Sequence, residues 1–182
     1  SPPREVLERG EFVEPLERLR EQGKVRYWGV ACEHADDVQP SLRHQPLASI
    51  QVGLSALEQA ALDAAIPAAA ARGVAIIARQ VYASGLLTRP LEKLQPDQID
   101  SEPRVADRKR QQLEAYAAIA AQSGRSRVEL ALKFALAQPD VAVALLGISR
   151  AEHLEAGLNA LQAPDLTDQE RQLLLASRRP GR

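Results

Sequence analysis

The sequence has 182 residues, of which 45% are hydrophobic and 26% are charged, and these values exclude an intrinsically disordered chain. Its 23 lysines and arginines against 24 acids give a net charge of -1, so no strong field is available to attract nucleic acid or an acidic membrane. The length argues against two independent domains. We therefore expect a single domain over residues 1–182 and no nucleic-acid partner.

The cysteine content and the apolar runs indicate the cellular compartment of the protein. The single cysteine, Cys32, cannot form an internal disulfide, and one thiol with three histidines gives no closely spaced zinc ligand set. We expect no metal and a reducing, cytoplasmic compartment. The longest apolar run, residues 60–71, is interrupted by Asp63 and Pro67 and falls far below the roughly 20 residues that span a bilayer, so we expect no membrane partner. The absence of methionine predicts that the chain was processed or is the end of a longer one.

Helical and strand patterns alternate along the first half of the chain. Phe12, Leu16 and Leu19 share one face of a predicted helix over 11–22, which Gly23 ends. The elements predicted after it are a strand over 25–31, a short polar helix over 34–43, a strand over 48–53, a helix over 57–72 with a kink at Pro67, and an apolar strand over 74–79.

The second half begins with a break in this rhythm. Residues 81–105 contain Pro90, Pro96 and Pro103 and predict a long surface loop. The elements predicted after the loop are helices over 107–122 and 126–138, a strand over 141–147, and helices over 151–161 and 168–177. Two of these helices open with capping-box spacing, Ser126 with Glu129 and Thr167 with Glu170.

Four strands separated by helices predict an α/β fold of the (β/α)8 TIM-barrel type, here about half a barrel with four parallel strands. The alternative is a doubly wound sheet. That fold is normally accompanied by a G-x-G-x-x-G motif after its first strand, and the sequence has no such motif.

Several stretches, in order, resemble the aldo-keto reductases. They are G-K-V-R-Y-W-G-V (23–30), A-S-I-Q (48–51), G-V-A-I-I-A-R (73–79), A-S-G-L-L-T (83–88), and E-L-A-L through G-I-S to E-H-L-E (129–155). The resemblance implies strands five to eight, the carboxyl-terminal half of the family's barrel. It also implies that the catalytic tetrad belongs to a missing amino-terminal half, so no catalytic residue is assigned here.

The resemblance implies a cofactor-binding role for two residues at the ends of strands. Gln51 matches the glutamine that binds the nicotinamide amide, a task that suits a side chain with both donor and acceptor; the alternative is a polar residue satisfied inside the barrel. Arg79 stands where the family commonly stacks an aromatic residue on nicotinamide. Its guanidinium can stack or contact phosphate, or it can pair with an acid in the barrel rim.

Further cofactor-binding residues are expected in the two loops that follow the last two strands. Ser84 and Gly85, with Leu86 beside them, resemble the loop over the pyrophosphate, although a tight structural turn explains the same residues. Ser149 and Arg150 precede a helix, where an anion is favoured, and stand at the family's site for the ribose 2'-phosphate. The resemblance adds two residues that flank this pair, Gly147 and His153.

Two departures from the family pattern keep other functions open. Ala31 and Cys32 replace a serine and an asparagine, and a buried inert thiol is the favoured interpretation of Cys32 over a nucleophile. Ala156 and Gly157 replace a Glu-Asn pair near the adenine.

The leading hypothesis is the cofactor-binding part of an NAD(P)H-dependent oxidoreductase that reduces aldehydes or ketones, with NADP as the cofactor and NAD as the alternative. The alternatives are a non-catalytic regulatory or structural subunit with the same fold, and a pseudo-enzyme fragment that only associates with a partner. Because half a barrel leaves open strand edges, we also expect self-association or pairing with the missing half.

Overall fold

A computed structural model describes residues 1–178 of the chain. The sheet consists of β1 (Gly29–Ala31), β2 (Ser49–Gly53), β3 (Ala75–Arg79) and β4 (Val141–Ala144). All neighbouring strands are parallel, in the order β1-β2-β3-β4. The predicted α/β fold with four parallel strands is confirmed.

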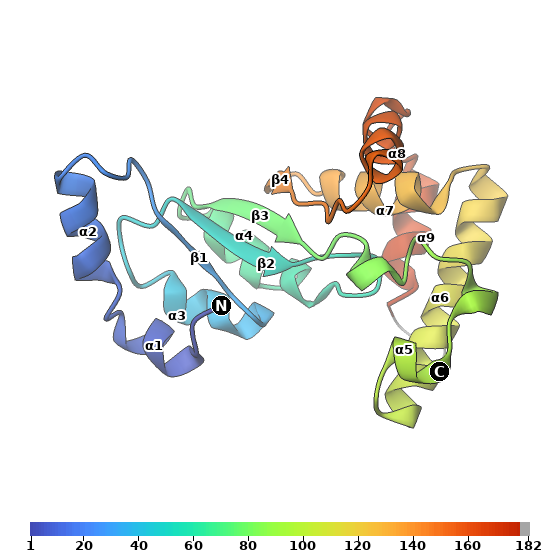
Figure 1. The fold of residues 1–182 in the computed structure, drawn as a ribbon, viewed down its shortest axis with the longest axis horizontal. Helices are drawn as coiled ribbons and strands as arrows, with labels where there is room; N and C mark the ends of the chain where they lie inside the picture. Colours follow the sequence, from blue (N-terminus) through green and yellow to red (C-terminus); the bar gives the residue numbers. More distant parts are fainter. Residues whose placement is uncertain (179–182) are drawn as a thin grey trace.

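Helices connect the strands and extend beyond both ends of the sheet (Figure 1). The α-helices are α1 (Arg4–Arg9), α2 (Val13–Glu21), α3 (Val38–Ser41), α4 (Ala65–Ala70), α5 (Pro96–Ile99), α6 (Pro103–Ser123), α7 (Arg127–Leu136), α8 (Ala151–Gln162) and α9 (Asp168–Ala176). Single turns of 3-10 helix are η1 (Ala35–Asp37), η2 (Ala60–Leu62), η3 (Ala83–Gly85) and η4 (Leu91–Lys93). Figure 1 shows α1 and α2 at one end of the molecule and the long α6 at the other.

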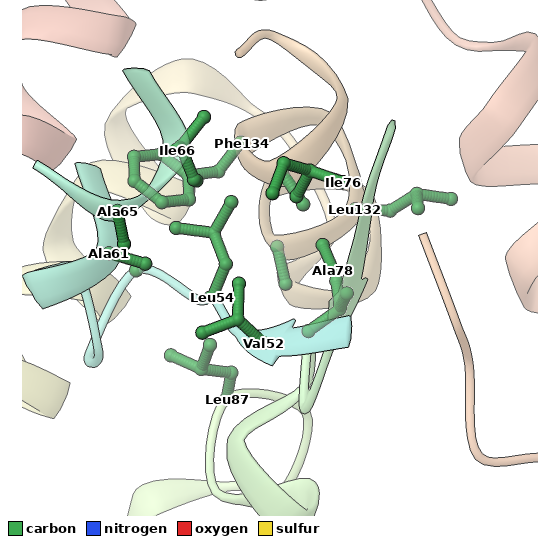
Figure 2. Close-up of a cluster of buried hydrophobic side chains, with 14 of the residues drawn as sticks. Val52, Leu54, Ala61, Ala65, Ile66, Ile76, Ala78, Leu87, Leu132 and Phe134 are labelled. Atoms are coloured by element: carbon green, nitrogen blue, oxygen red, sulfur yellow. The ribbon is translucent and has the colours of Figure 1, made fainter. Parts of the chain in front are cut away.

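The core lies between one face of the sheet and the helices. Ile50 and Val52 of β2 and Ile76 and Ala78 of β3 are fully buried on that face. They belong to a cluster with side chains from α4 and α7, among them Ile66, Leu132 and Phe134 (Figure 2). Because a strand directs alternate side chains to opposite faces, the residues between them point the other way.

The other face of the sheet is only partly covered within residues 1–178. Gln51, Ile77 and Arg79 are half-buried there, whereas Val143 is 45% exposed and Leu145 beyond it is 43% exposed. Parallel sheets are normally covered on both faces. This open face therefore corresponds to the interior of a barrel of which the sheet forms half.

The first strand is shorter than predicted. The sequence pattern predicts a strand from residue 25, but only Gly29–Ala31 pairs with β2. The indole of Trp28 instead donates to Glu17 Oε1 at 2.6 Å and packs edge-on against Phe12, while Tyr27 is exposed. A contact with the preceding helix therefore holds the Trp28 side chain.

The predicted helix over 57–72 is also wrong in extent. The chain forms η2 and then begins α4 only at Ala65, so Pro67 is its third residue. A proline further inside a helix would clash with the carbonyl four residues earlier, whereas the first turn tolerates it. Pro67 therefore lies in the first turn of a shorter helix and does not kink a long one.

The predicted loop over 81–105 contains more structure than expected. It includes η3, η4 and α5, and α6 begins at Pro103. Pro96 and Pro103 are each the first residue of a helix, a position that needs no N–H donor. The sequence analysis also missed α1 entirely, and it extended the last strand past Ala144.

Candidate functional site

A cavity of about 470 Å³ lies where β3 and β4 end. Its lining comes from the loop after β3, the loop after β4, and the facing helices α7 and α8: Gln80, Val81, Tyr82, Ser84, Gly85, Thr88, Val128, Leu145, Gly147, Ser149, His153 and Ala156. Two loops that are far apart in sequence therefore meet at one cavity. Five residues predicted from the sequence lie on its wall: Ser84, Gly85, Gly147, Ser149 and His153.

The loop after β3 has an unusual backbone. Gln80, Ala83 and Ser84 have φ values of 57°, 47° and 55°, and Gly85 has a φ of 86°. The left-handed region costs a non-glycine residue about 1 kcal/mol, and such residues cluster at functional sites. The turn satisfies the Ala83 N–H, which donates to the carbonyl of Gln80 at 2.7 Å. The sequence identified Ser84 and Gly85, but no glycine marks Gln80 or Ala83.

Three polar side chains form a cluster before and within the first turn of α8. The Arg150 guanidinium donates to His153 Nε2 at 3.2 Å, and Ser149 Oγ lies 3.2 Å from His153 Nδ1. Arg150 itself is the exposed residue before the helix, and its side chain does not cap it. A cation, a hydroxyl and a helix N-terminus thus meet at the edge of the cavity, an arrangement that suits an anion.

Arg79 is placed elsewhere, on the open face of the sheet. It donates to the backbone carbonyls of Cys32 (3.0 Å) and Glu33 (3.1 Å), and forms an ion pair with the Glu33 carboxylate at 3.3 Å. The guanidinium therefore ties the loop after β1 to the end of β3. This is the acid-paired arrangement that the sequence left open as one alternative.

Gln51 and Leu86 also lie outside the lining of the cavity. Gln51 is a half-buried residue of β2, in register with Ala31 of β1 and Ile77 of β3, on the open face of the sheet. Leu86 is buried in the core next to the turn. Its side chain therefore supports the loop.

A second cavity of about 380 Å³ lies where β1 and β2 end. Its lining is Glu33, His34, Ala35, Asp36, Val52, Gly53, Glu58, Ala60 and Gln80. Three carboxylates make this cavity acidic. Gln80 is the residue that lines both this cavity and the first.

The sequence analysis missed Tyr82 in the first cavity. Its hydroxyl is buried and has no hydrogen-bond partner within residues 1–178, and burial raises the pKa of the phenol. Gly157 of α8 lies close by, because a Cβ built on it would be 3.2 Å from Leu146 Cδ1 and 3.9 Å from the Tyr82 hydroxyl. The glycine therefore lets α8 approach the loops closely.

Cys32 is fully buried, and its Sγ lies 3.5 Å from Ser41 Oγ. Burial raises the pKa of the thiol, so it stays protonated. The predicted burial of Cys32 is therefore confirmed. Among the described residues there is no group of three or more histidine, cysteine, aspartate or glutamate side chains that could hold a metal ion, nor a helix long and apolar enough to cross a membrane.

The family model for the aldo/keto reductase family matches residues 3–177. The chain belongs to this family. A curated relative, the uncharacterized oxidoreductase YqkF of Bacillus subtilis (strain 168), is 26% identical over 166 residues, which cover 88% of this chain and 52% of YqkF.

Solved structures of aldo/keto reductases share the fold of this chain. The holo form of aldo-keto reductase AKR11C1 from Bacillus halodurans superposes with a TM-score of 0.76 at 26% identity, over 92% of this chain and 55% of that one. The glycerol dehydrogenase AKR11B4 from Gluconobacter oxydans shares the fold, with a TM-score of 0.70 at 22% identity, over 92% of this chain and 54% of its own. The chain thus spans about half the length of these relatives, and its four parallel strands match half of their (β/α)8 barrel.

Proposed function

We propose that this chain is the carboxyl-terminal, cofactor-binding half of an NAD(P)H-dependent aldo-keto reductase that reduces aldehydes or ketones. The observation that carries the proposal is the convergence of Ser84, Gly85, Gly147, Ser149 and His153 on one cavity at the carboxyl ends of β3 and β4. In β/α barrels the ligand binds at that end of the strands. These residues come from the loop after β3 and from the loop after β4 with the first turn of α8, about sixty positions apart in the sequence, and the fold brings them together.

The polar groups around the cavity suit a dinucleotide phosphate. Arg150 and Ser149 offer a cation and a hydroxyl beside the start of α8, and the left-handed turn at Ser84 and Gly85 brings backbone close to the cavity. We assign the ribose 2'-phosphate of NADP to Arg150, Ser149 and His153, and the pyrophosphate to the turn. When bound, the cofactor would supply the hydride, and the chain would hold and orient it.

Gln51 and Arg79 take different parts in this proposal. Gln51 lies on the open face, where its carboxamide would meet the nicotinamide amide inside a closed barrel. Arg79 would shape the rim of the site through Glu33 and the carbonyl of Cys32, and would not stack on the nicotinamide ring. Ala156 replaces an acidic residue at the cavity wall, so adenine would be held there by apolar contact.

The relatives described above carry the names of an oxidoreductase, a reductase and a dehydrogenase. The alternative of a non-catalytic subunit is therefore not favoured. The acid that protonates the carbonyl is not assigned to any residue of this chain, and carbonyl reduction needs such a positioned proton donor.

The test is a titration of the purified 182-residue chain with NADPH, followed by the fluorescence of the dihydronicotinamide, together with an assay of aldehyde and ketone reduction on the same material. We expect binding without turnover, and turnover once an amino-terminal half that carries the tetrad is added. Failure of the chain to bind NADPH would contradict the cofactor-binding role. Reduction by the pure chain would contradict the assignment of the proton donor to the other half.

A further inference from the structure

Gln59 connects the loop after β2 to the helix α9. It stands between Glu58 and Ala60, which both line the second cavity, where β1 and β2 end. Gln59 is only 2% exposed and does not belong to that lining itself. Neither the sequence pattern, which predicted a helix here, nor the family resemblance identified it.

The carboxamide of Gln59 donates two hydrogen bonds. Its Nε2 lies 2.8 Å from the carbonyl oxygen of Ala56, in the same loop, and 2.9 Å from that of Leu174. Leu174 belongs to the last turn of α9, where the backbone carbonyls have no partner inside the helix. Gln59 therefore closes its own turn and caps a helix end 115 positions away in the sequence.

The acceptor of the same carboxamide has no use in packing. Oε1 of Gln59 is buried and has no hydrogen-bond partner within residues 1–178. A buried acceptor without a partner costs stability, whereas a leucine of similar size would fill the space without that cost. Packing alone does not account for a glutamine here, and the two donated bonds are what its carboxamide adds.

A second contact joins the same loop to the same end of α9. Arg178, two residues after the helix, forms an ion pair with Asp63 at 2.8 Å, and its carbonyl accepts from Gln112 of α6. Within residues 1–178, the contacts of Gln59 and Asp63 are the hydrogen bonds that residues 55–63 make with distant parts of the chain. The position of this loop therefore depends on α9.

We propose that Gln59 is a positioning residue, which fixes one wall of the second cavity against α9. The inference rests on the proposed function, in which Gln51 of β2 meets the nicotinamide, because β2 ends at this cavity. The wall that Glu58 and Ala60 form then stands beside the nicotinamide end of the cofactor, whereas the adenosine end lies beside α8. A small displacement of such a wall weakens binding, so the wall needs a rigid support.

The test compares two probes on the wild-type chain and on three variants. NADPH reaches the second cavity, whereas adenosine 2',5'-bisphosphate carries only the adenosine end. Gln59→Leu removes both hydrogen bonds and keeps the side-chain volume. Asp63→Ala removes an ion pair of an exposed carboxylate at little cost to folding. Gln138→Leu is the matched control, because Gln138 is also buried, donates to a backbone carbonyl and precedes β4, at the end of the sheet away from both cavities.

We expect Gln59→Leu to weaken binding of NADPH about fivefold and Asp63→Ala about twofold, with the affinity for adenosine 2',5'-bisphosphate unchanged. Hydrogen exchange at the amides of residues 58–62 should become faster in both variants. Gln138→Leu should change neither readout. If Gln59→Leu does not fold, Asp63→Ala decides the outcome by the same comparison.

Three outcomes would overturn this inference alone. Equal losses of NADPH affinity in Gln59→Leu and Gln138→Leu would show a general loss of stability. Faster exchange in Gln59→Leu without a loss of NADPH affinity would show that the wall has no part in binding. If the wild-type chain binds NADPH no more tightly than adenosine 2',5'-bisphosphate, nothing beyond the adenosine end contacts the chain.

A fourth outcome concerns the proposed function as well. If the wild-type chain binds neither probe, the proposed function fails, and the role of Gln59 in cofactor binding fails with it.

Discussion

His153 lies between Ser149 and Arg150, with a polar atom of each 3.2 Å from a different ring nitrogen. A guanidinium can only donate, so Nε2 of the neutral imidazole accepts from Arg150 and Nδ1 carries the proton. The Nδ1–H then donates to Ser149 Oγ. The serine hydroxyl proton and the remaining guanidinium donors are therefore left to face an anion.

This geometry predicts the effect of removing the cation. Arg150→Ala should weaken binding of NADPH about tenfold, the loss expected for a charge-assisted hydrogen bond to phosphate, and should change binding of NADH about twofold or less. Titration of both nucleotides measures the difference. Arg108→Ala on the exposed side of α6 is the control. An equal loss for both nucleotides would show that Arg150 does not contact the 2'-phosphate.

Arg125 links the start of α7 to α9 and to the segment that precedes α9. Its side chain is 11% exposed, forms ion pairs with Glu129 and Glu170, and donates to the backbone carbonyls of Pro164 and Asp165, both at 2.8 Å. Arg125→Ala leaves two carboxylates without their partner, so we expect the free energy of unfolding to fall by about 3 kcal/mol. Urea denaturation measures it. Arg108→Ala should change it by about 0.5 kcal/mol or less, and an equally small loss in Arg125→Ala would show that water replaces these contacts.

The stabilisation from the Arg125–Glu170 ion pair should depend on pH through the Glu170 carboxyl. The hydrogen bond from Arg125, with those from the Thr167 N–H and hydroxyl, lowers the pKa of the carboxyl below its ordinary value of 4.5. A lowered pKa in the folded state stabilises the protein above the ordinary value, and the stabilisation is lost as the pH falls through the folded pKa. The wild type should therefore be more stable than Glu170→Gln at neutral pH, and the difference should shrink below pH 4.5. Urea denaturation across this range measures it, and a difference that stays constant in acid would refute the role of the charge.

The strands were predictable because their apolar runs are short and bounded by glycine or by polar turns. Residues 48–53 and 74–79 were predicted to within one residue of β2 and β3. The first strand was predicted to begin at residue 25 because this stretch is rich in β-branched and aromatic residues. One of them, Trp28, instead directs its indole to Glu17, 11 positions earlier, and no local pattern reports such a contact. Pro67 was misinterpreted because the same residue kinks the middle of a helix and is tolerated in its first turn.

The residues of the candidate site also fall into those that the sequence predicted and those that it did not. Ser149 and Gly85 belong to stretches with recognisable patterns, and both reach the cavity. Gln80 and Tyr82 could not be found, because a left-handed glutamine and a buried phenol leave no mark in the composition or spacing of the sequence. Arg79 was found, but its pairing with Glu33 depends on how the ends of β1 and β3 are placed.

The close approach of β1 to β2 leaves no room for a side chain at Gly29. A Cβ at this position would stand 2.2 Å from Ser49 Oγ and 2.6 Å from the Ser49 carbonyl oxygen, so β1 cannot pair with β2 without shifting. Gly29→Ala should lower the free energy of unfolding by about 2 kcal/mol or more, as overpacking does. Gly147→Ala, whose Cβ meets nothing within 4 Å in the described structure, is the matched control. Thermal and urea unfolding of both variants measure the effect, and equal stabilities would show that β1 moves freely.

The two outer strands predict self-association of the 182-residue chain. Within residues 1–178, each of β1 and β4 has a neighbouring strand on one side only. The open face beside β4 carries Val143 and Leu145, which are 45% and 43% exposed. Unpaired parallel edges next to an apolar face invite pairing with another chain. We expect the apparent mass in sedimentation to rise above 19.8 kDa with concentration.

Val143→Lys places a charge on that face and should weaken the association about tenfold, because lysine is the residue that most often protects an open strand. Leu173→Glu is the control, since this exposed leucine lies on α9, outside the sheet. If the two variants weaken association equally, the contact lies elsewhere on the molecule. A well-folded wild-type monomer at high concentration would mean that the edges of β1 and β4 need no partner, and the half-barrel would then be stable with an open sheet.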